Sequence, residues 1–467
     1  MGEGPLVELD YNNLMADKVG RHGLSDADFE RGRPVLTAAL ERLSAERAKG
    51  ERPFLDMPRA DLKPLLDFAK EREGRYDDLL LLGIGGSSLG AVALQGALGD
   101  PLHNLLSRVR RKGSPRFFVV DHTDPDHLSR VLRFLKAPRT LVMVVSKSGA
   151  TAETLAAWII VRDWLKSKVS DIRDHLVFIT DPSKGYLRRL GSDLGVPLFP
   201  IPPALGGRFS VLSPVGLLPS AILGLDITEL CRGAATMTEI SLKPQLGLNP
   251  AAVRALAHHL LEKERGKTLN VFMPYVQSLR GVGDWFVQLW AESLGKRHNV
   301  TGQEVFHGQT PVRAIGVTDQ HSQVQLFVEG PNDKVLSFVS VRRFSTRGKI
   351  ADDTGGDPDV GYLSGATLQK LTECERLGTE VALTRAERPN CHLTLPRISP
   401  ETVGALLQML MVETALTGYL AGINPYDQPG VETGKRITFA KMGRTGYEAE
   451  LEAIKPHLSR KSKYICG

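Results

Sequence analysis

The fold class is set by the stretch Val144-Val145-Ser146-Lys147-Ser148-Gly149-Ala150-Thr151-Ala152-Glu153-Thr154. The apolar run from Leu141 to Val145 predicts a buried strand, and a helical pattern begins at Thr151 and continues through Trp164. A small polar turn joins the two. A strand, a turn and a helix in this order are typical of an α/β protein with a parallel sheet.

The turn itself is rich in hydroxyl groups. Backbone N–H groups, the hydroxyls of Ser146, Ser148 and Thr151, and the start of the helix are expected to point at one spot, which is what a phosphate dianion needs. Lys147 either adds a point charge there or is solvated. An ordinary turn capped by serine or threonine would leave the same pattern, so the turn alone does not decide the function.

The composition is that of a soluble globular protein with a small basic excess. The chain has 467 residues, 42% of them hydrophobic and 24% charged, and this length predicts two or three domains. The tight basic clusters, at 108–112 and 460–463, contain no interleaved aromatic residues, so we interpret both as solvated surface. The formal net charge of +6 suits an anionic metabolite and falls short of what nucleic-acid binding needs.

Cysteine usage and hydropathy predict a cytoplasmic protein without a membrane span. The four cysteines form no CxxC pair, which argues against a zinc site and against a disulfide framework. No signal peptide is visible at the start of the sequence. Residues 79–98 carry no charge but contain five glycines and two adjacent serines, so a strand, a glycine turn and a buried helix explain them better than a membrane helix.

The patterns divide the chain into four parts. We expect an N-terminal helical extension at 1–75, a first α/β domain at 76–240, a second α/β domain at 249–435 and a C-terminal segment at 436–467. Strands of the first domain are predicted at 79–82, 117–120, 141–145 and 176–179. The second domain is predicted to contain strands at 269–273, 314–317, 324–328, 335–341 and 391–395, with helices at 251–263, 285–294, 368–375 and 401–420.

A glycine-rich turn, residues 82–90, follows the first predicted strand. Its paired glycines and serines, which include Gly86 and Ser87, predict a cradle for an anion or a sugar hydroxyl. A dinucleotide fingerprint would need glycine at position 88, where Ser88 stands, so a nicotinamide cofactor is weakly supported.

Further candidates for chemistry lie in three other segments. Arg208 follows two glycines, where it is suited to stabilise developing negative charge, although a surface arginine in a tight turn is the alternative. Gln288 and Glu292 are four residues apart and share a helix face. The apolar neighbours of Glu292 in the sequence suit it to act as a general base, and an exposed glutamate at a helix end is the alternative.

A histidine and a polar loop complete the set. His321 lies just past a predicted strand, in the turn 318–322, and a histidine titrates near neutrality. The loop 427–435 is dense in polar residues and glycine, and its shaped backbone surrounds Gln428 and Lys435. None of these segments is decisive by itself.

Taken together and in order, the motifs resemble the glucose-6-phosphate isomerase family. They are the GIGGS turn, the S-K-[ST] turn ending in T-x-E-T, the GGR-[FY]-S segment, the Q-x-x-x-E-S-x-G-K helix, the glutamine–histidine turn and the D-Q-x-G-V-E-x-G-K loop. The resemblance spans residues 80 to 440, and the last motif is highly specific. Ala150 is a departure, because bacterial relatives usually carry threonine at this place in the phosphate turn.

The resemblance implies two sugar-isomerase (SIS) α/β/α domains with mainly parallel sheets, and interconversion of glucose 6-phosphate and fructose 6-phosphate through a cis-enediol. By this resemblance Glu292 is the base, Arg208 stabilises the enediolate, and His321 with Lys435 opens the sugar ring. The remaining implied contacts are to the phosphate from Ser146, Lys147, Ser148 and Thr151, to the sugar from Gly86 and Ser87, and to hydroxyls from Gln288 and Gln428.

The resemblance also implies a homodimer whose active site is shared, with His321 supplied by the partner subunit. Proton transfer of this kind needs no redox cofactor, and the sequence offers no convincing metal site. A non-catalytic sugar-phosphate sensor on the same domains remains the alternative. Such a sensor would keep the phosphate turn but would not need Glu292, Arg208 and Lys435 together.

Overall fold

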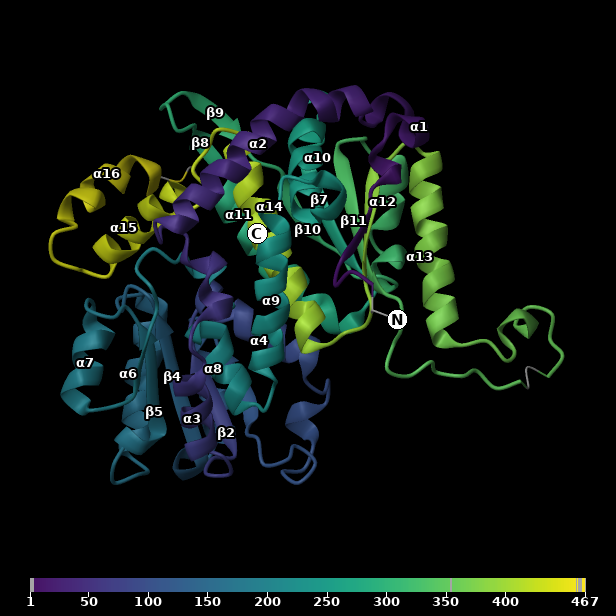
Figure 1. Ribbon diagram of the computed structural model, residues 1–467. Coiled ribbons are helices and arrows are strands. Elements are labelled where there is room, and N and C mark those ends of the chain that lie inside the picture. The colour runs from purple at the N-terminus through teal and green to yellow at the C-terminus, as the bar shows by residue number, and fades with distance from the viewer. Residues whose placement is uncertain (1–3, 353–354, 459, 461–463, 467) are drawn as a thin grey trace.

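The computed structural model describes residues 4–352, 355–458, 460 and 464–466 and contains two five-stranded sheets, each covered by helices on both faces (Figure 1). The first sheet has the order β3-β2-β4-β5-β6 and is parallel throughout. Its strands are β2 (Asp78–Leu82), β3 (Arg116–Val120), β4 (Thr140–Ser146), β5 (Leu176–Thr180) and β6 (Leu198–Pro200).

Every residue of β2 and β4 is buried, because helices pack on both faces of this sheet. Leu79 and Leu81 point to one helical layer, whereas Leu80 and Leu82 point to the other, as the two-residue repeat of a strand requires. The first layer consists of α3 (Lys63–Glu71), α4 (Leu89–Leu98) and α8 (Pro214–Ile222), and the second of α5 (Pro125–Phe134), α6 (Ala152–Lys166) and α7 (Tyr186–Leu194).

The strand order places a topological switch point between β2 and β4. The chain leaves β2 toward β3 on one side and then returns to β4 on the other, so the loops after β2 and β4 diverge. Leu82 is in register with Val144, and the loops 83–88 and 147–151 therefore begin side by side. Ligands of open α/β sheets bind in such a crevice at the carboxyl ends of the strands.

The second sheet has the order β1-β12-β11-β7-β10, and only β1 runs antiparallel to its neighbour. Its strands are β1 (Glu8–Asp10), β7 (Leu269–Pro274), β10 (Thr310–Arg313), β11 (Lys334–Val341) and β12 (Asn390–Leu395). One face carries α10 (Pro250–Arg265), α11 (Arg280–Leu294) and α14 (Pro400–Leu420), and the other carries α12 (Val324–Glu329) and α13 (Leu368–Arg385).

Other elements surround the two sheets. The long helix α2 crosses the top of the second sheet in Figure 1, and α15 and α16 lie to one side of it. The bounds of these elements are α1 (Ala16–Val19), α2 (Asp26–Ala48), α9 (Ile227–Ser241), α15 (Glu432–Lys441) and α16 (Glu448–Leu458), with the short hairpin β8 (Lys296–His298) and β9 (Glu304–His307).

Helix α14 is the central core helix. It is the one helix of the described residues that is long and apolar enough to cross a membrane, yet its apolar window is entirely buried inside the protein. It packs between α9 and α10, which gives its apolar composition an ordinary explanation.

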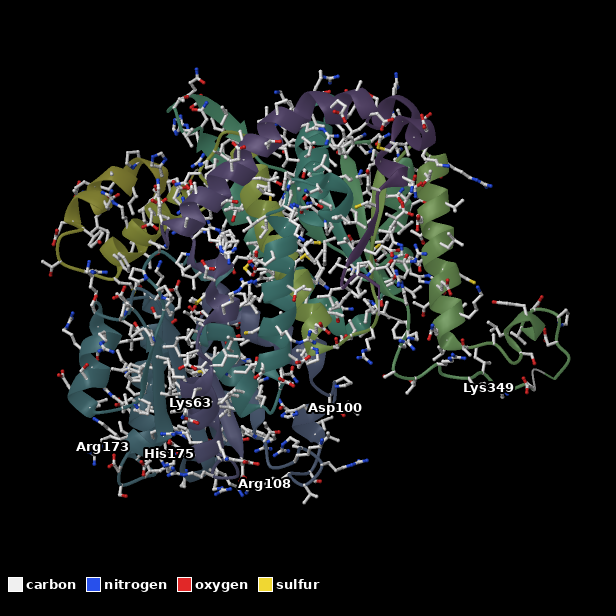
Figure 2. The ribbon with its side chains drawn as sticks, in the orientation of Figure 1. Lys63, Asp100, Arg108, Arg173, His175 and Lys349 are labelled. Carbon is white, nitrogen blue, oxygen red and sulfur yellow. The ribbon has the colours of Figure 1, made fainter. Side chains whose placement is uncertain are left out.

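The basic surface of the first sheet lies away from the switch point. Figure 2 labels Arg108, Arg173 and His175 at the amino ends of the strands, where Arg108 pairs with Asp77 at 3.2 Å. Lys349, labelled in the same figure, belongs to a segment that extends away from the second sheet. Of the second basic cluster, residues 461–463 lie outside the described residues.

The predicted fold class, α/β with mainly parallel sheets, is confirmed, and so are the strands 79–82, 117–120, 141–145 and 176–179 within small shifts of their ends. The strand predicted at 324–328 is wrong, because these residues form α12. A short apolar run cannot distinguish a strand from a helix: Phe327 is buried in the core, whereas Leu326 is 59% exposed.

Two further corrections concern strand positions. The strand predicted at 314–317 lies at 310–313 instead, although Ala314 N–H still donates to Phe272 O of β7 at 3.0 Å. Within the N-terminal extension, where only helices are expected, β1 adds a strand to the edge of the second sheet. Three residues are too short for a periodic signal. The domain limits themselves stay a prediction.

Candidate active site

The hydroxyl-rich turn lies at the carboxyl end of β4, next to the switch point. Ser146 Oγ lies 2.8 Å from Thr151 Oγ1, and Ser148 Oγ lies 3.5 Å from the same atom. Gly149 has φ +62°, a left-handed conformation that favours glycine and lets the turn double back. The three predicted hydroxyls are therefore gathered at one point.

The start of α6 is left without a side-chain cap. Thr151 occupies the N-cap position, but its side chain accepts no hydrogen bond from the first turn of the helix. Thr154 Oγ1 is buried and has no hydrogen-bond partner among the described residues. The ordinary capped turn, considered as the alternative from the sequence, is thus not what forms here, and the free donors suit an anion.

Lys147 is half-buried beside this turn. Burial lowers the pKa of its ammonium group; Asp181 opposes this, and the positive charge of Arg208 adds to it. An incoming anion would therefore be favoured electrostatically, because it would restore the charge balance around Lys147 and Arg208.

The loop 83–88 packs directly against the segment that carries Arg208. A Cβ atom on Gly86 would lie 2.3 Å from the carbonyl carbon of Gly207, so no side chain fits at position 86. Ser210 Oγ adds a hydrogen bond of 3.2 Å to Gly86 O. The Gly86–Ser87 turn and Arg208 are consequently held side by side.

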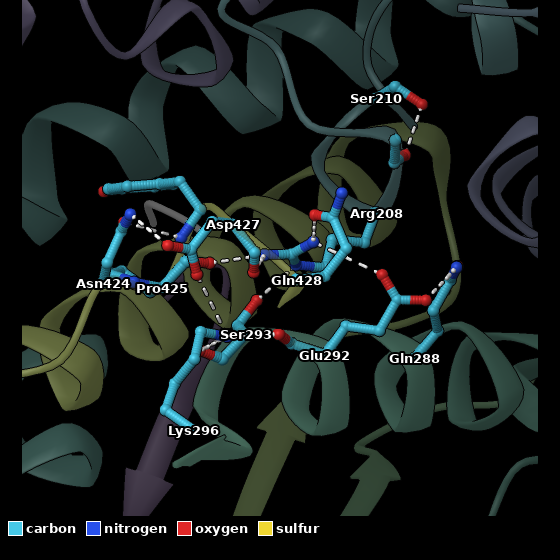
Figure 3. Close-up of polar contacts among 12 residues, drawn as sticks. Arg208, Ser210, Gln288, Glu292, Ser293, Lys296, Asn424, Pro425, Asp427 and Gln428 are labelled. Atoms are coloured by element: carbon cyan, nitrogen blue, oxygen red, sulfur yellow. Dashed lines mark hydrogen bonds and ion pairs between the residues drawn. The ribbon is translucent and has the colours of Figure 1, made fainter. Parts of the chain in front are cut away.

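Arg208 is 2% exposed and lies in the short 3-10 helix at Gly207–Phe209. Its Nη2 donates to two backbone carbonyls, Pro425 O at 2.7 Å and Asp427 O at 3.0 Å, and its Nε donates to Ser293 Oγ at 2.7 Å (Figure 3). Burial lowers the pKa of the guanidinium, although an arginine stays charged at any ordinary pH. These bonds fix its direction.

The carboxylate of Glu292 faces Arg208 at the C-terminal end of α11. Arg208 Nη1 lies 3.3 Å from Glu292 Oε2 and donates to Gln428 Oε1 at 2.9 Å. Gln288 Nε2 donates to the other oxygen, Glu292 Oε1, at 3.0 Å. The neighbours of this carboxylate are thus polar, unlike the apolar residues beside it in the sequence: Trp290 is fully buried on another face of the helix, and Ala291 is exposed.

Two charged residues of the site, Lys296 and Asp427, were not singled out from the sequence. Lys296 is 6% exposed, and its Nζ donates to Glu292 O at 2.6 Å and to Ser293 O at 2.9 Å. Burial lowers the pKa of Lys296 to about 8; nearby Arg208 contributes to the shift and Asp427, 3.8 Å away, opposes it. Both residues stand inside the quoted motifs, but only the packing reveals that Lys296 supports the end of α11.

His321 and Lys435 lie outside this cluster in the described chain. His321 is exposed and ends the 3-10 helix at Thr318–His321, which leads to α12, on the face of the second sheet opposite α11. Lys435 is exposed on α15 and pairs with Glu432 at 2.8 Å. The structure therefore brings Arg208, Gln288, Glu292 and Gln428 together and does not bring His321 or Lys435 to them.

Across the residues that the structure describes, no group of three or more histidine, cysteine, aspartate or glutamate side chains is arranged to hold a metal ion. The chemistry available at the site is that of a carboxylate, a fixed guanidinium and two amides.

Two mainly parallel sheets, a buried arginine paired with a carboxylate, and a nearby hydroxyl-rich turn with an uncapped helix start are typical of an α/β enzyme that acts on a phosphorylated small molecule. The family model of phosphoglucose isomerase matches residues 70–352 and 368–450. The chain belongs to this family.

Individual relatives agree over nearly the whole chain. The chain is 44% identical to the glucose-6-phosphate isomerase of Carboxydothermus hydrogenoformans, with 96% of this chain and 97% of that protein aligned. It is 43% identical to that of Rubrobacter xylanophilus, over 95% and 99% of the two chains. The crystal structure of a hypothetical protein from Thermus thermophilus is similar with a TM-score of 0.81 and 38% identity, over 93% of this chain and 99% of that one. These relatives give no support to a non-catalytic sensor.

Proposed function

We propose that this protein interconverts glucose 6-phosphate and fructose 6-phosphate. The observation that carries the proposal is the arrangement of Glu292 between Arg208 and Gln288, close to a turn with free anion donors. An aldose–ketose isomerisation needs a base, a fixed positive charge and a hold on the substrate phosphate, and these are the groups that the cluster supplies. The reaction is a step of glycolysis and gluconeogenesis, and we propose a cytoplasmic location for it.

The substrate phosphate is bound by the turn after β4. Ser146, Ser148 and Thr151 donate their hydroxyls, the first N–H groups of α6 donate along the helix axis, and Lys147 supplies charge. Gly86 and Ser87 contact the sugar, and the close packing of Gly86 on the backbone of Gly207 and Arg208 keeps this turn beside the arginine. Gln288 and Gln428 hold hydroxyl groups of the open chain.

Proton transfer is the task of Glu292. In the direction from aldose to ketose, its carboxylate takes the proton from C2, the electrons of that C–H bond form the C1–C2 double bond, and the carbonyl electrons move to O1, which gives an enediolate. A proton then passes from the hydroxyl on C2 to O1, and the carbonyl re-forms at C2 as the same carboxyl group returns its proton to C1, so charge and electrons balance. The guanidinium of Arg208 stabilises the negative charge that develops, and five hydrogen bonds already fix its position.

Ring opening precedes this step and uses His321 and Lys435 as acid and base on the ring oxygen and the anomeric hydroxyl. Neither side chain lies in the cluster of its own chain. We therefore propose a homodimer in which His321 of one chain completes the site of the other. Lys435 lies on the exposed helix α15, at the end of the motif 427–435 that also supplies Gln428 to the cluster.

The test is a coupled assay in which the protein converts fructose 6-phosphate to glucose 6-phosphate and an added dehydrogenase oxidises the glucose 6-phosphate that forms. We expect turnover with the purified chain and exchange of the C2 proton with solvent. The matched control is Glu304→Gln, which removes an exposed carboxylate on β9 and should leave both signals unchanged. Absence of turnover and of C2 exchange in the folded protein would contradict the proposal.

A further inference from the structure

The N-terminal segment reaches the neighbourhood of Arg208 through an aromatic cluster. Phe54, in the 3-10 helix at Pro53–Leu55, is 2% exposed, and its ring centroid lies 4.9 Å from that of Phe209. The Phe209 centroid lies 5.6 Å from that of Tyr426. Phe209 directly follows Arg208 in the chain. The packing around the site arginine thus includes a side chain from a part of the protein that contributes nothing to the cluster itself.

Tyr426 is held by charged and polar groups that also come from the N-terminal segment. The guanidinium carbon of Arg52 lies 4.0 Å from the centre of the Tyr426 ring, a cation–π arrangement. Arg52 Nε donates to Glu46 Oε2 at 2.6 Å, and Glu46 also accepts a hydrogen bond from the hydroxyl of Tyr419. The hydroxyls of Tyr419 and Tyr426 are 2.9 Å apart. Arg52 therefore contacts the Tyr426 ring directly, and Glu46 is linked to Tyr426 through Arg52 and Tyr419.

The residues on either side of Tyr426 are the ones that hold Arg208. Pro425 O and Asp427 O both accept from Arg208 Nη2, at 2.7 and 3.0 Å. The next residue, Gln428, accepts from Nη1. Because Tyr426 stands between the two carbonyls, a shift of its ring would turn both of them and would move the guanidinium relative to Glu292.

We propose that Arg52 and Glu46 are positioning residues of the isomerase. They hold Tyr426 and, through the carbonyls of Pro425 and Asp427, keep Arg208 aimed at the place where the enediolate charge develops. This inference rests on the proposed function for the reaction that Arg208 serves. It gives the N-terminal segment a role in catalysis although neither residue belongs to the cluster of Arg208, Gln288, Glu292 and Gln428.

The central test is Arg52→Gln, measured with two non-reacting ligands as well as with substrate. Arabinonate 5-phosphate carries a carboxylate that mimics the enediolate, whereas sorbitol 6-phosphate carries the same phosphate without that charge. We expect kcat to fall roughly tenfold with KM nearly unchanged, because the misplaced donor acts mainly in the transition state. The affinity for arabinonate 5-phosphate should fall by a similar factor, and that for sorbitol 6-phosphate should stay within about twofold.

The matched control is Arg31→Gln, which removes ion pairs to Asp28 and Glu264 at the other end of α2. It should leave kcat and both ligand affinities unchanged. Arg52→Lys keeps the charge beside Glu46 but loses the planar group over Tyr426, and it should recover part of the turnover. If Arg52→Gln does not fold, Arg52→Lys and Tyr426→Phe carry the test, each with an expected loss of a few-fold in kcat.

A structural readout separates positioning from general stability. Amide hydrogen exchange should quicken in the loop 424–431 of Arg52→Gln and stay unchanged there in Arg31→Gln. The inference is overturned if Arg52→Gln matches Arg31→Gln in turnover, or if the two ligands lose affinity equally. A wild-type chain without isomerase activity would contradict the proposed function instead, so the two failures are distinguishable.

Discussion

The Arg208 cluster and the pair His321 and Lys435 belong to one proposed site, yet they differ in burial and in contacts. Arg208 is 2% exposed, makes five hydrogen bonds and meets Glu292 across two sequence-distant segments. His321 and Lys435 are exposed and contact none of these groups. The single chain therefore assembles the groups that we propose for proton transfer between carbons, whereas the groups that we propose for ring opening lie outside that cluster.

The largest effect that tests this contrast is expected for Glu292→Gln. Binding of phosphosugars should stay nearly intact, while turnover should fall by about 10²-fold or more, the usual contribution of a positioned base. Exchange of the C2 proton, followed by NMR in deuterated water, should vanish. A variant with near-normal turnover would make Glu292 a structural residue and would remove one side of the comparison.

Smaller losses are expected at the phosphate turn, which the same chain also assembles. Ser148→Ala and Thr151→Ala should each raise KM by roughly tenfold with little change in kcat, because the phosphate contact is made equally in ground and transition states. Ser167→Ala, at the exposed far end of α6, serves as the control. A fall in kcat at constant KM would speak against a simple phosphate contact here.

Mixed dimers test whether His321 acts from the partner chain. Glu292→Gln and His321→Ala chains, each nearly inactive, are denatured together and refolded. With random pairing, half of the dimers are mixed and each mixed dimer has one intact site of its two, so activity should return to about one quarter of wild type. An inactive mixture, with mixed dimers verified by native mass spectrometry, would refute the shared site and leave the isomerase assignment standing.

The smallest expected effect concerns Lys296, whose pKa is lowered to about 8 by burial, with Arg208 contributing. The unfolded chain binds this proton more tightly than the folded one, so the stability contributed by Lys296 rises between pH 8 and its ordinary pKa of 10.5. The difference in free energy of unfolding between wild type and Lys296→Met should therefore increase in this window, by at most about 1.4 kcal/mol per pH unit. Urea titrations at several pH values measure it, and a flat difference would contradict a buried, charged Lys296.

Much of the fold follows from local patterns that the sequence displays openly. The apolar runs at 79–82 and 141–145 predict buried strands because a parallel sheet covered on both faces removes every side chain of such a run from water, and both runs end in a glycine- or hydroxyl-rich turn. The same logic fails for 324–328, a run of similar length that Gln325 interrupts, because Phe327 alone is buried in α12. Apolar runs do not predict β1 at all, because its three residues form a strand only by pairing with β12.

The sequence by itself determined the fold class and the position of the hydroxyl-rich turn after a buried strand, since apolar periodicity and turn composition are local properties, and its resemblance to a family predicted the residues that would carry the chemistry. Only the tertiary structure decided which of those residues meet. Lys296, Asp427 and Ser293 join Arg208, and Arg52 reaches Tyr426, because loops from distant parts of the chain converge where helices and sheets pack. His321 and Lys435 stand apart for the same reason. Contacts of this kind depend on how whole layers dock, which no short stretch of sequence encodes.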